Sequence, residues 1–277
     1  MTGLTGGWIC QTCGVEYPRT DRPPAECLIC TDERQYVPLA GQKWTTSESL
    51  ALKGTAADVE FLEPGLYRMT VSPRVGIGQQ SLLVQTAAGN LLWEPPGFID
   101  DATVAAVRAL GGVAVISSSH PHLTGASISW SEAFDHAPVY AAEADQAWIT
   151  RPDDAIRLWS GIERPLPGVA FVQCGGHFPG SSMAHWAAGA DGRGVYLTGD
   201  TIFVGPSRWT VSAMRSYPNL IPLPERAIRQ ILDAMEPHDY DRLYGSFGQV
   251  VEVDAREVVE TSLERYITWI RGDVDDY

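Results

Sequence analysis

The sequence predicts an α/β protein with a small metal-binding module near its N-terminus. Two pairs of closely spaced cysteines stand near the start of the 277-residue chain. The rest of the chain contains apolar, strand-like runs and segments with helical periodicity. Hairpins and helices do not follow one another in strict β-α order, which excludes a simple Rossmann arrangement. We therefore expect a short module followed by a larger core of mixed sheets and helices.

The division of the chain follows from these patterns. We expect a four-cysteine module at residues 1–38, a linker at 39–55 and the larger domain at 56–277. The module is too short to bury enough apolar surface to fold alone, so a bound ion would supply its folding energy. Because the two parts are predicted as separate units, loss of the module's ion should leave metal bound in the larger domain.

The four cysteines of the module form two C-x2-C pairs, Cys10 with Cys13 and Cys27 with Cys30. Thiolates at this spacing can surround one ion, as in zinc ribbons and rubredoxin-like knuckles. Two disulfides would need an oxidising compartment, yet the first residues have no signal-peptide character. We expect a structural zinc and a cytoplasmic protein. An iron that transfers electrons is the alternative.

The first half of the larger domain carries a predicted hairpin and a predicted helix. Residues 81–86 and 91–93 alternate as strands around a turn at 87–90. Residues 100–110 have helical periodicity, and the helix should end at the glycine pair that follows them.

Two further helices are predicted near the C-terminus. Residues 225–235 place apolar side chains on one face, and Pro224 suits the start of that helix. The last helix should begin at Asp254, with Glu257 completing a capping box. Its predicted buried stripe consists of Val259, Leu263, Tyr266, Ile267 and Ile270.

Three apolar runs each end in a candidate metal ligand. The runs are residues 113–116, 169–172 and 195–197. They lead to His120 and His122 in the motif S-H-P-H, to His177 in G-G-H-F-P-G-S, and to Asp200 in T-G-D. Three strands would thus deliver imidazole and carboxylate groups to one edge of a sheet. Such a group of side chains is typical of a metal site.

The order of these motifs resembles the metallo-β-lactamase superfamily, whose pattern is H-x-H-x-D-H, then G-H-x-P-G-S, then G-D. The resemblance runs from about Glu60 to the C-terminus and is most specific at residues 176–181 and 199–203. It implies a four-layer αββα sandwich. Thr124, Gly125 and Phe247 stand where ligands of a second metal are usual. We therefore expect one metal in the cleft and about two metals per chain.

Three functions remain open at this point. His120, His122 and His177 could hold a zinc that lowers the pKa of its water to about 7, with Asp200 as a ligand or proton acceptor. This predicts a mononuclear hydrolase of a small ester, thioester or lactone. A smaller set, of two histidines and one carboxylate, would consist of His120, His177 and Asp200. This is the ligand type of non-haem iron oxygenases, and it resembles the persulfide dioxygenases of the superfamily. Iron is therefore an alternative to zinc in the cleft. A non-catalytic binding protein is the third possibility.

Composition narrows the range of partners. The chain has 20 basic and 34 acidic residues, a net charge of −14, which argues against nucleic acid. No apolar stretch approaches the roughly 20 residues that a membrane span needs. We expect a small-molecule substrate, and the sequence leaves the oligomeric state open. Arg215 could hold an anionic substrate, and Tyr244 and Ser246 could donate hydrogen bonds to a developing oxyanion.

The sequence also predicts the environment of one further cysteine, three further histidines and five aromatic residues. Cys174 ends an apolar strand and should be a buried small side chain rather than a nucleophile. Three further histidines match no ligand motif and should be structural or exposed: His136, His185 and His238. Five aromatic residues near the ligand motifs could wall a cleft: Trp130, Phe134, Phe178, Phe203 and Trp209.

Overall fold

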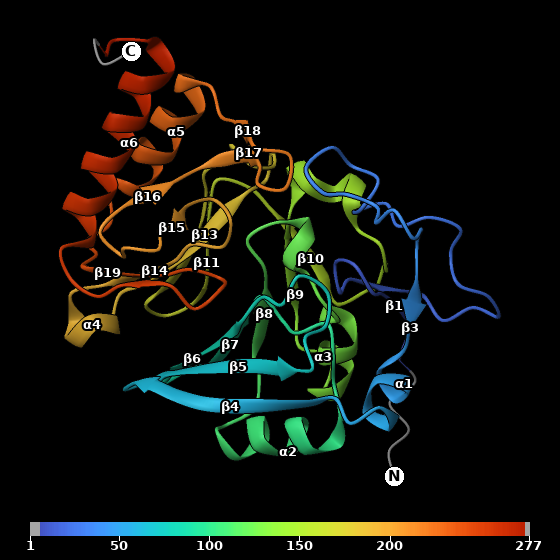
Figure 1. The fold of residues 1–277 in the computed structure, drawn as a ribbon. Helices are drawn as coiled ribbons and strands as arrows, with labels where there is room; N and C mark the ends of the chain where they lie inside the picture. Colours follow the sequence, from blue (N-terminus) through green and yellow to red (C-terminus); the bar gives the residue numbers. More distant parts are fainter. Residues whose placement is uncertain (1–5, 275–277) are drawn as a thin grey trace.

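A computed structural model describes residues 6–274 and contains two large sheets (Figure 1). The strands of the first sheet are β4 (Ala56–Glu63), β5 (Leu66–Ser72), β6 (Ser81–Thr86), β7 (Gly89–Trp93), β8 (Val115–Ser117), β9 (Val139–Ala142) and β10 (Ile156–Trp159). Their spatial order is β10-β9-β8-β7-β6-β5-β4. Strands β4 to β7 are antiparallel neighbours, whereas β7 to β10 are parallel. The parallel half leads to the first pair of histidines.

The second sheet has six strands in the order β11-β12-β13-β14-β19-β20. They are β11 (Ile162–Leu166), β12 (Val169–Gln173), β13 (Ser182–Trp186), β14 (Val195–Leu197), β19 (Arg242–Tyr244) and β20 (Val250–Val251). The short helix α4 (Gly189–Gly192) connects β13 to β14. Two small hairpins follow, β15 (Phe203–Val204) with β16 (Val211–Ser212) and β17 (Met214–Ser216) with β18 (Ile221–Pro222).

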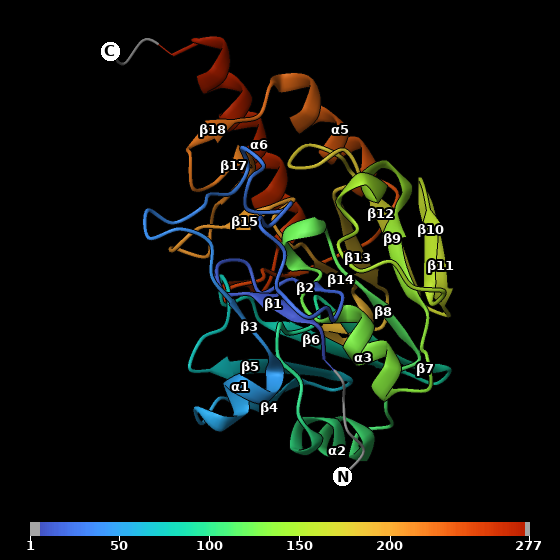
Figure 2. The same cartoon turned by 90° about the vertical axis from the view of Figure 1, so that its right-hand side faces the viewer.

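Helices cover the outer faces of both sheets (Figures 1 and 2). They are α2 (Asp101–Ala109) and α3 (Ser127–Ala133) on the first sheet, and α5 (Glu225–Met235) and α6 (Ala255–Arg271) on the second. The predicted four-layer αββα sandwich is therefore confirmed. Among the described residues, none of the helices combines the length and the apolar character that crossing a membrane requires.

Side chains that point alternately to the two faces of each strand explain why both faces of the sheets are apolar. Trp93 of β7 and Phe171 of β12 point between the sheets, and their rings lie 5.7 Å apart. Their neighbours Leu92 and Val172 point the other way, into the layers that hold the helices. Since successive side chains of a strand face opposite sides, each strand contributes to two apolar layers. Burial on both faces accounts for the nearly continuous apolar runs in the sequence.

Most predicted elements are present with small shifts. The hairpin of β6 and β7 pairs Thr86 with Gly89, so its turn is shorter than the predicted 87–90. Helix α2 begins after Asp100, whose carboxylate accepts a hydrogen bond from Thr103 N at 2.7 Å. Helix α5 has the predicted bounds, after Pro224.

The predicted capping box of the last helix is wrong. Asp254 has φ 55° and makes no side-chain capping bond, because a cap of that kind needs an extended backbone. Instead its own N–H donates to Asp241 Oδ1 at 3.0 Å. The buried stripe of α6 ends at Ile267, one turn before the helix does, and Ile270 is 39% exposed rather than buried.

The N-terminal module is a small antiparallel sheet with the order β2-β1-β3. Its strands are β1 (Trp8–Cys10), β2 (Glu16–Tyr17) and β3 (Trp44–Thr45), followed by helix α1 (Ser47–Leu52). Both β3 and α1 lie in the segment predicted as a linker, so the sheet of the module extends beyond residue 38. The module packs against the larger domain, where Glu16 forms an ion pair with Arg151 at 2.8 Å.

Candidate metal centre

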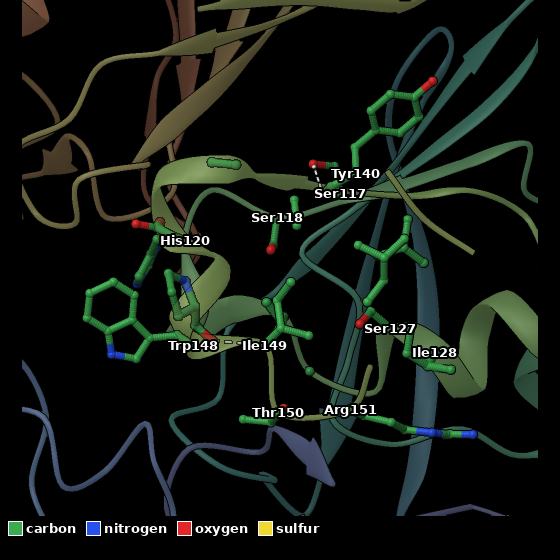
Figure 3. Close-up of a pocket in the computed structure, with 18 of the residues that line it drawn as sticks. Ser117, Ser118, His120, Ser127, Ile128, Tyr140, Trp148, Ile149, Thr150 and Arg151 are labelled. Atoms are coloured by element: carbon green, nitrogen blue, oxygen red, sulfur yellow. Dashed lines mark hydrogen bonds between the residues drawn. The ribbon is translucent and has the colours of Figure 1, made fainter. Parts of the chain in front are cut away.

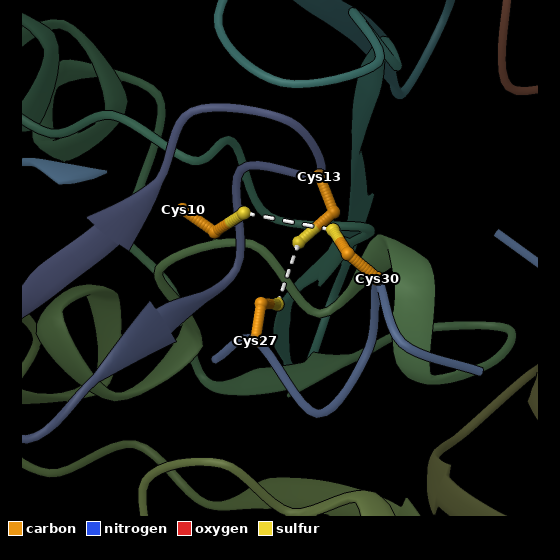
Figure 4. A group of neighbouring side chains, drawn as sticks. All are labelled: Cys10, Cys13, Cys27 and Cys30. Carbon is orange, nitrogen blue, oxygen red and sulfur yellow. Dashed lines mark hydrogen bonds between the residues drawn. The ribbon is translucent and has the colours of Figure 1, made fainter. Parts of the chain in front are cut away.

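The four cysteines converge in the module (Figure 4). All are buried and unpaired by disulfides, with Cys10 Sγ 3.6 Å from Cys30 Sγ and Cys13 Sγ 3.7 Å from Cys27 Sγ. A tetrahedral ion with metal–sulfur bonds of about 2.3 Å needs sulfur–sulfur edges of about 3.8 Å. The spacing of the thiols therefore fits a four-coordinate metal, and it is far longer than a disulfide bond.

The predicted ligands of the larger domain also converge. His120 follows β8, His122 lies in the short 3-10 helix Pro121–Leu123, His177 follows β12 and Asp200 follows β14. One ligand atom from each lies within 4.8 Å of all the others, and all four residues are buried. His120 Nε2 is 3.7 Å from Asp200 Oδ2. The sheet edges thus bring together the four residues that the motifs indicated.

Hydrogen bonds at Nδ1 leave Nε2 of His120 and His177 free to bind a metal. His177 Nδ1 lies 3.0 Å from Met214 O, and a carbonyl can only accept, so Nδ1 carries the proton. His120 Nδ1 lies 2.8 Å from Ser119 Oγ, which donates to Glu94 Oε1. The Nε2 atoms of His120, His122 and His177 are buried without a hydrogen-bond partner. Buried polar atoms are normally paired, so a metal ion would account for these three.

Burial shifts the pKa values of the three histidines and of Asp200. It lowers the pKa values of His120 and His122 well below their usual range and that of His177 to about 4. The imidazoles are therefore neutral, which is the form that binds metals. Burial also raises the pKa of Asp200 to about 7, because its negative charge is poorly solvated there. A bound cation would compensate that charge.

Glu94 is a residue of the site that the sequence motifs missed. It follows β7 with φ 57° and accepts hydrogen bonds of 2.6 Å from both Ser119 Oγ and Ser246 Oγ. Burial raises its pKa to about 8. Through Ser119 it orients the His120 ring. The sequence does contain a sign of Glu94: like the candidate ligands, it is a polar residue that follows an apolar strand.

Two glycines explain the shape of the ligand loops. Gly199 has φ +56°, and a Cβ there would lie 2.0 Å from Ser119 Oγ, so only glycine lets the Asp200 turn approach the His120 loop. Gly125 has φ +50°, and a Cβ there would lie 1.9 Å from Pro95 O. A histidine has no room at that position. Within residues 6–274, one group of candidate metal ligands borders the cleft.

A cleft opens beside His122, His177 and Asp200, and the four-cysteine module forms part of its wall. Thr12 and Tyr36 come from the module, whereas Phe203, Tyr217 and Phe247 come from the larger domain.

Comparisons with known proteins place the chain in a family. It is 41% identical to the uncharacterized protein YmaE of Bacillus subtilis (strain 168) over 269 residues, which cover 96% of this chain and 98% of the relative. The chain belongs to the YmaE family. No family model matches the sequence.

Solved structures identify the fold of this YmaE-family chain as that of the metallo-β-lactamases. VMB-1 superposes with a TM-score of 0.57 at 13% identity, over 77% of this chain and 98% of its own. The DIM-1 metallo-β-lactamase has the same TM-score and identity, over 76% and 98%. A B3 metallo-β-lactamase with an active-site glutamic acid has a TM-score of 0.52 at 15% identity, over 91% and 99%. At these identities the likeness concerns the fold alone.

The three residues predicted to bind substrate each have a partner within the protein. The guanidinium of Arg215 pairs with Glu33 of the module. Tyr244 OH donates to Glu63 Oε1 at 2.8 Å in the core between the sheets, and Ser246 donates to Glu94. None of the three is among the residues that line the cleft.

The five predicted aromatic residues divide between core, cleft and surface. Phe203 lines the cleft, and Phe178 packs against all three ligand histidines. Trp130 and Phe134 stack in the core beneath α3, with centroids 6.0 Å apart. Trp209 is 64% exposed.

A second pocket borders the His120 loop (Figure 3). Ile128 and Ile149 form apolar walls of this pocket, and Ser118 and Ser127 supply hydroxyl groups. Of the four ligand residues only His120 borders it, whereas the other three border the cleft. The cleft is therefore the candidate for chemistry at a metal.

The remaining histidines lie outside the metal group. His136 is exposed. His185 Nε2 lies 2.8 Å from Asp239 O, and His238 Nδ1 lies 2.9 Å from Tyr196 OH. These positions agree with the prediction that they are structural or exposed.

We expect the Cys174 thiol to be unreactive in the folded protein. It is fully buried, and burial raises its pKa to about 12, so almost no thiolate forms at pH 8. Alkylation with iodoacetamide followed by peptide mass spectrometry measures this directly. Unfolded, metal-free protein is the control and should be alkylated at all five cysteines. Rapid alkylation of Cys174 in the native protein would show that it faces solvent.

Proposed function

We propose that the chain is a mononuclear zinc hydrolase that cleaves a small ester, thioester or lactone, with a second, structural zinc in the four-cysteine module. The observation that carries the proposal is the convergence of three partnerless, buried Nε2 atoms with the Asp200 carboxylate. Three imidazoles with an open position are the usual donors of a catalytic zinc. Such an ion would polarise a carbonyl group and lower the pKa of a water molecule to about 7.

In this proposal Asp200 accepts a proton from the attacking water and passes it to the departing oxygen or sulfur atom. Water oxygen adds to the carbonyl carbon, the C–O or C–S bond breaks, and the products are a carboxylic acid and an alcohol or thiol. The water proton needs an acceptor close to the histidines, and Asp200 Oδ2 lies 3.7 Å from His120 Nε2. A cation bound by the histidines would favour the carboxylate form of Asp200, which is the form that accepts a proton.

The ligand set favours zinc over the iron alternative. An iron site with two histidines and one carboxylate would need only His120, His177 and Asp200. His122 belongs to the same group within 4.8 Å, and its Nε2 is buried without a partner. A third imidazole supports a zinc-type site.

The charge of the chain argues against a nucleic-acid substrate, and we propose a small molecule instead. The net charge of −14 disfavours nucleic acid as a partner. We also infer that the chain works in a reducing, cytoplasmic compartment, because a four-thiolate metal site requires reduced cysteines.

Turnover by the protein in defined metal states tests the proposal. We expect metal-free protein to be inactive toward a panel of small esters, thioesters and lactones, and added zinc to restore hydrolysis. His177→Ala is the inactive comparison, and His136→Ala, an exposed histidine, is the matched control. If fully zinc-loaded protein hydrolyses nothing, the chain is not a hydrolase of these substrates. Oxygen consumption with iron and a persulfide would then favour the oxygenase alternative.

A further inference from the structure

We propose that the four-cysteine module clamps both histidine loops of the cleft, so that its ion and the cleft metal bind cooperatively. The inference rests on the proposed metal sites but not on the hydrolysis reaction. It revises the expectation that the two sites bind metal independently. Two arms of the module, one after each cysteine pair, reach the ligand loops.

Arg34 is the first arm. It stands four residues after Cys30, and its side chain is only 7% exposed. Its Nε donates to His177 O at 2.7 Å, and its Nη1 donates to both carboxylate oxygens of Asp32 at 2.8 and 2.7 Å. The guanidinium carbon lies 4.2 Å from the centroid of the Phe178 ring. A buried cation with these partners holds the His177 backbone in one position.

The same arm also supports the residue that orients the His177 ring. Ser216 of β17 donates to Arg34 O at 3.3 Å, and Met214 of the same strand accepts the hydrogen bond from His177 Nδ1. Asn219 Nδ2 donates to Glu33 O at 2.7 Å. Thus both the backbone and the ring of His177 depend on contacts with residues 32–35. Arg34 acts through His177 and is therefore a positioning residue.

Glu16 is the second arm, three residues after Cys13. Its N–H donates to Gly125 O at 3.0 Å, directly after the loop that holds His120 and His122. Its buried carboxylate accepts hydrogen bonds from Ile128 N and Ser129 N at the start of α3. Arg151 balances the charge. This arm fixes the segment that follows the first two metal ligands.

The ion of the module would determine whether the arms are in place. The strands of the module have only two or three residues each, and a core of this size depends on its metal for folding. Loss of that ion would release Arg34 and Glu16 together. Because coupling between two binding sites is reciprocal, occupation of the cleft should also strengthen binding of the module's ion.

Zinc affinity of the cleft, measured by competition with a chelating indicator, tests the coupling without any substrate. Arg34→Lys keeps the charge but loses the Nε donor and the planar fork. We expect it to weaken cleft zinc by roughly 10–100-fold, as is typical for residues that orient a metal ligand. Protection of the four thiols from alkylation reports whether the module retains its ion. Arg22→Lys, an exposed arginine of the module, is the matched control and should leave cleft affinity unchanged.

Cys27→Ser supplies the second half of the test. It should remove the module's ion and weaken cleft zinc at least as much as Arg34→Lys does. Adding Arg34→Lys to Cys27→Ser should cause little further loss, because the arm is already released. Wild-type cleft affinity in Cys27→Ser would overturn the coupling. Wild-type affinity in Arg34→Lys, or fully additive losses in the double variant, would overturn the role of Arg34.

Discussion

Asp200→Asn should lower kcat/KM for the best substrate of the ester, thioester and lactone panel by roughly 10²–10⁴-fold, the range typical of a positioned acid or base. An amide keeps the shape of the carboxylate but cannot accept the proton, and it is a weaker metal ligand. The loss should exceed this range if the cleft metal also dissociates. Steady-state kinetics with the metal content of each preparation separates the two effects.

Asp191→Asn provides the control for that experiment. Asp191 is exposed in α4, which precedes β14, whereas Asp200 follows that strand, and its change should leave kcat/KM unaltered. Equal activity of Asp200→Asn and the wild type would exclude Asp200 as proton acceptor.

Trp93→Ala should give the largest loss of stability, about 3–5 kcal/mol in the free energy of unfolding. Trp93 is fully buried between the sheets and packs against Phe171. It also precedes Glu94, so its removal would loosen the support of His120. Urea unfolding followed by circular dichroism measures the change.

Trp209→Ala is the matched substitution. Its side chain is 64% exposed, and a surface change of this kind should stay within about 0.5 kcal/mol of the wild type. Similar free energies of unfolding for the two variants would mean that the space between the sheets is not the main core.

The sequence predicted the convergence of the four candidate ligands because each follows a strand, and strand ends meet at the edge of a sheet. That local rule is enough to predict the positions of His120, His122, His177 and Asp200. Partners that depend on distant pairing could not be predicted in this way. The hydrogen bond from Arg34 to His177 spans 143 residues.

Distant contacts affect two of the local patterns. Arg215 has the planar fork expected of an anion-binding residue, but Glu33, 182 residues away, occupies it. Asp254 has the sequence of a helix cap, but Asp241 holds its backbone in a left-handed conformation. In each case a tertiary contact outweighed a local preference.

The metal content of the purified protein, by elemental analysis of wild type and His177→Ala, tests the central claim most directly. The account predicts two ions per chain for the wild type, with zinc in the cleft, and one for His177→Ala. Three tightly bound ions in the wild type, or an unchanged content in His177→Ala, would contradict a single metal held by His120, His122, His177 and Asp200.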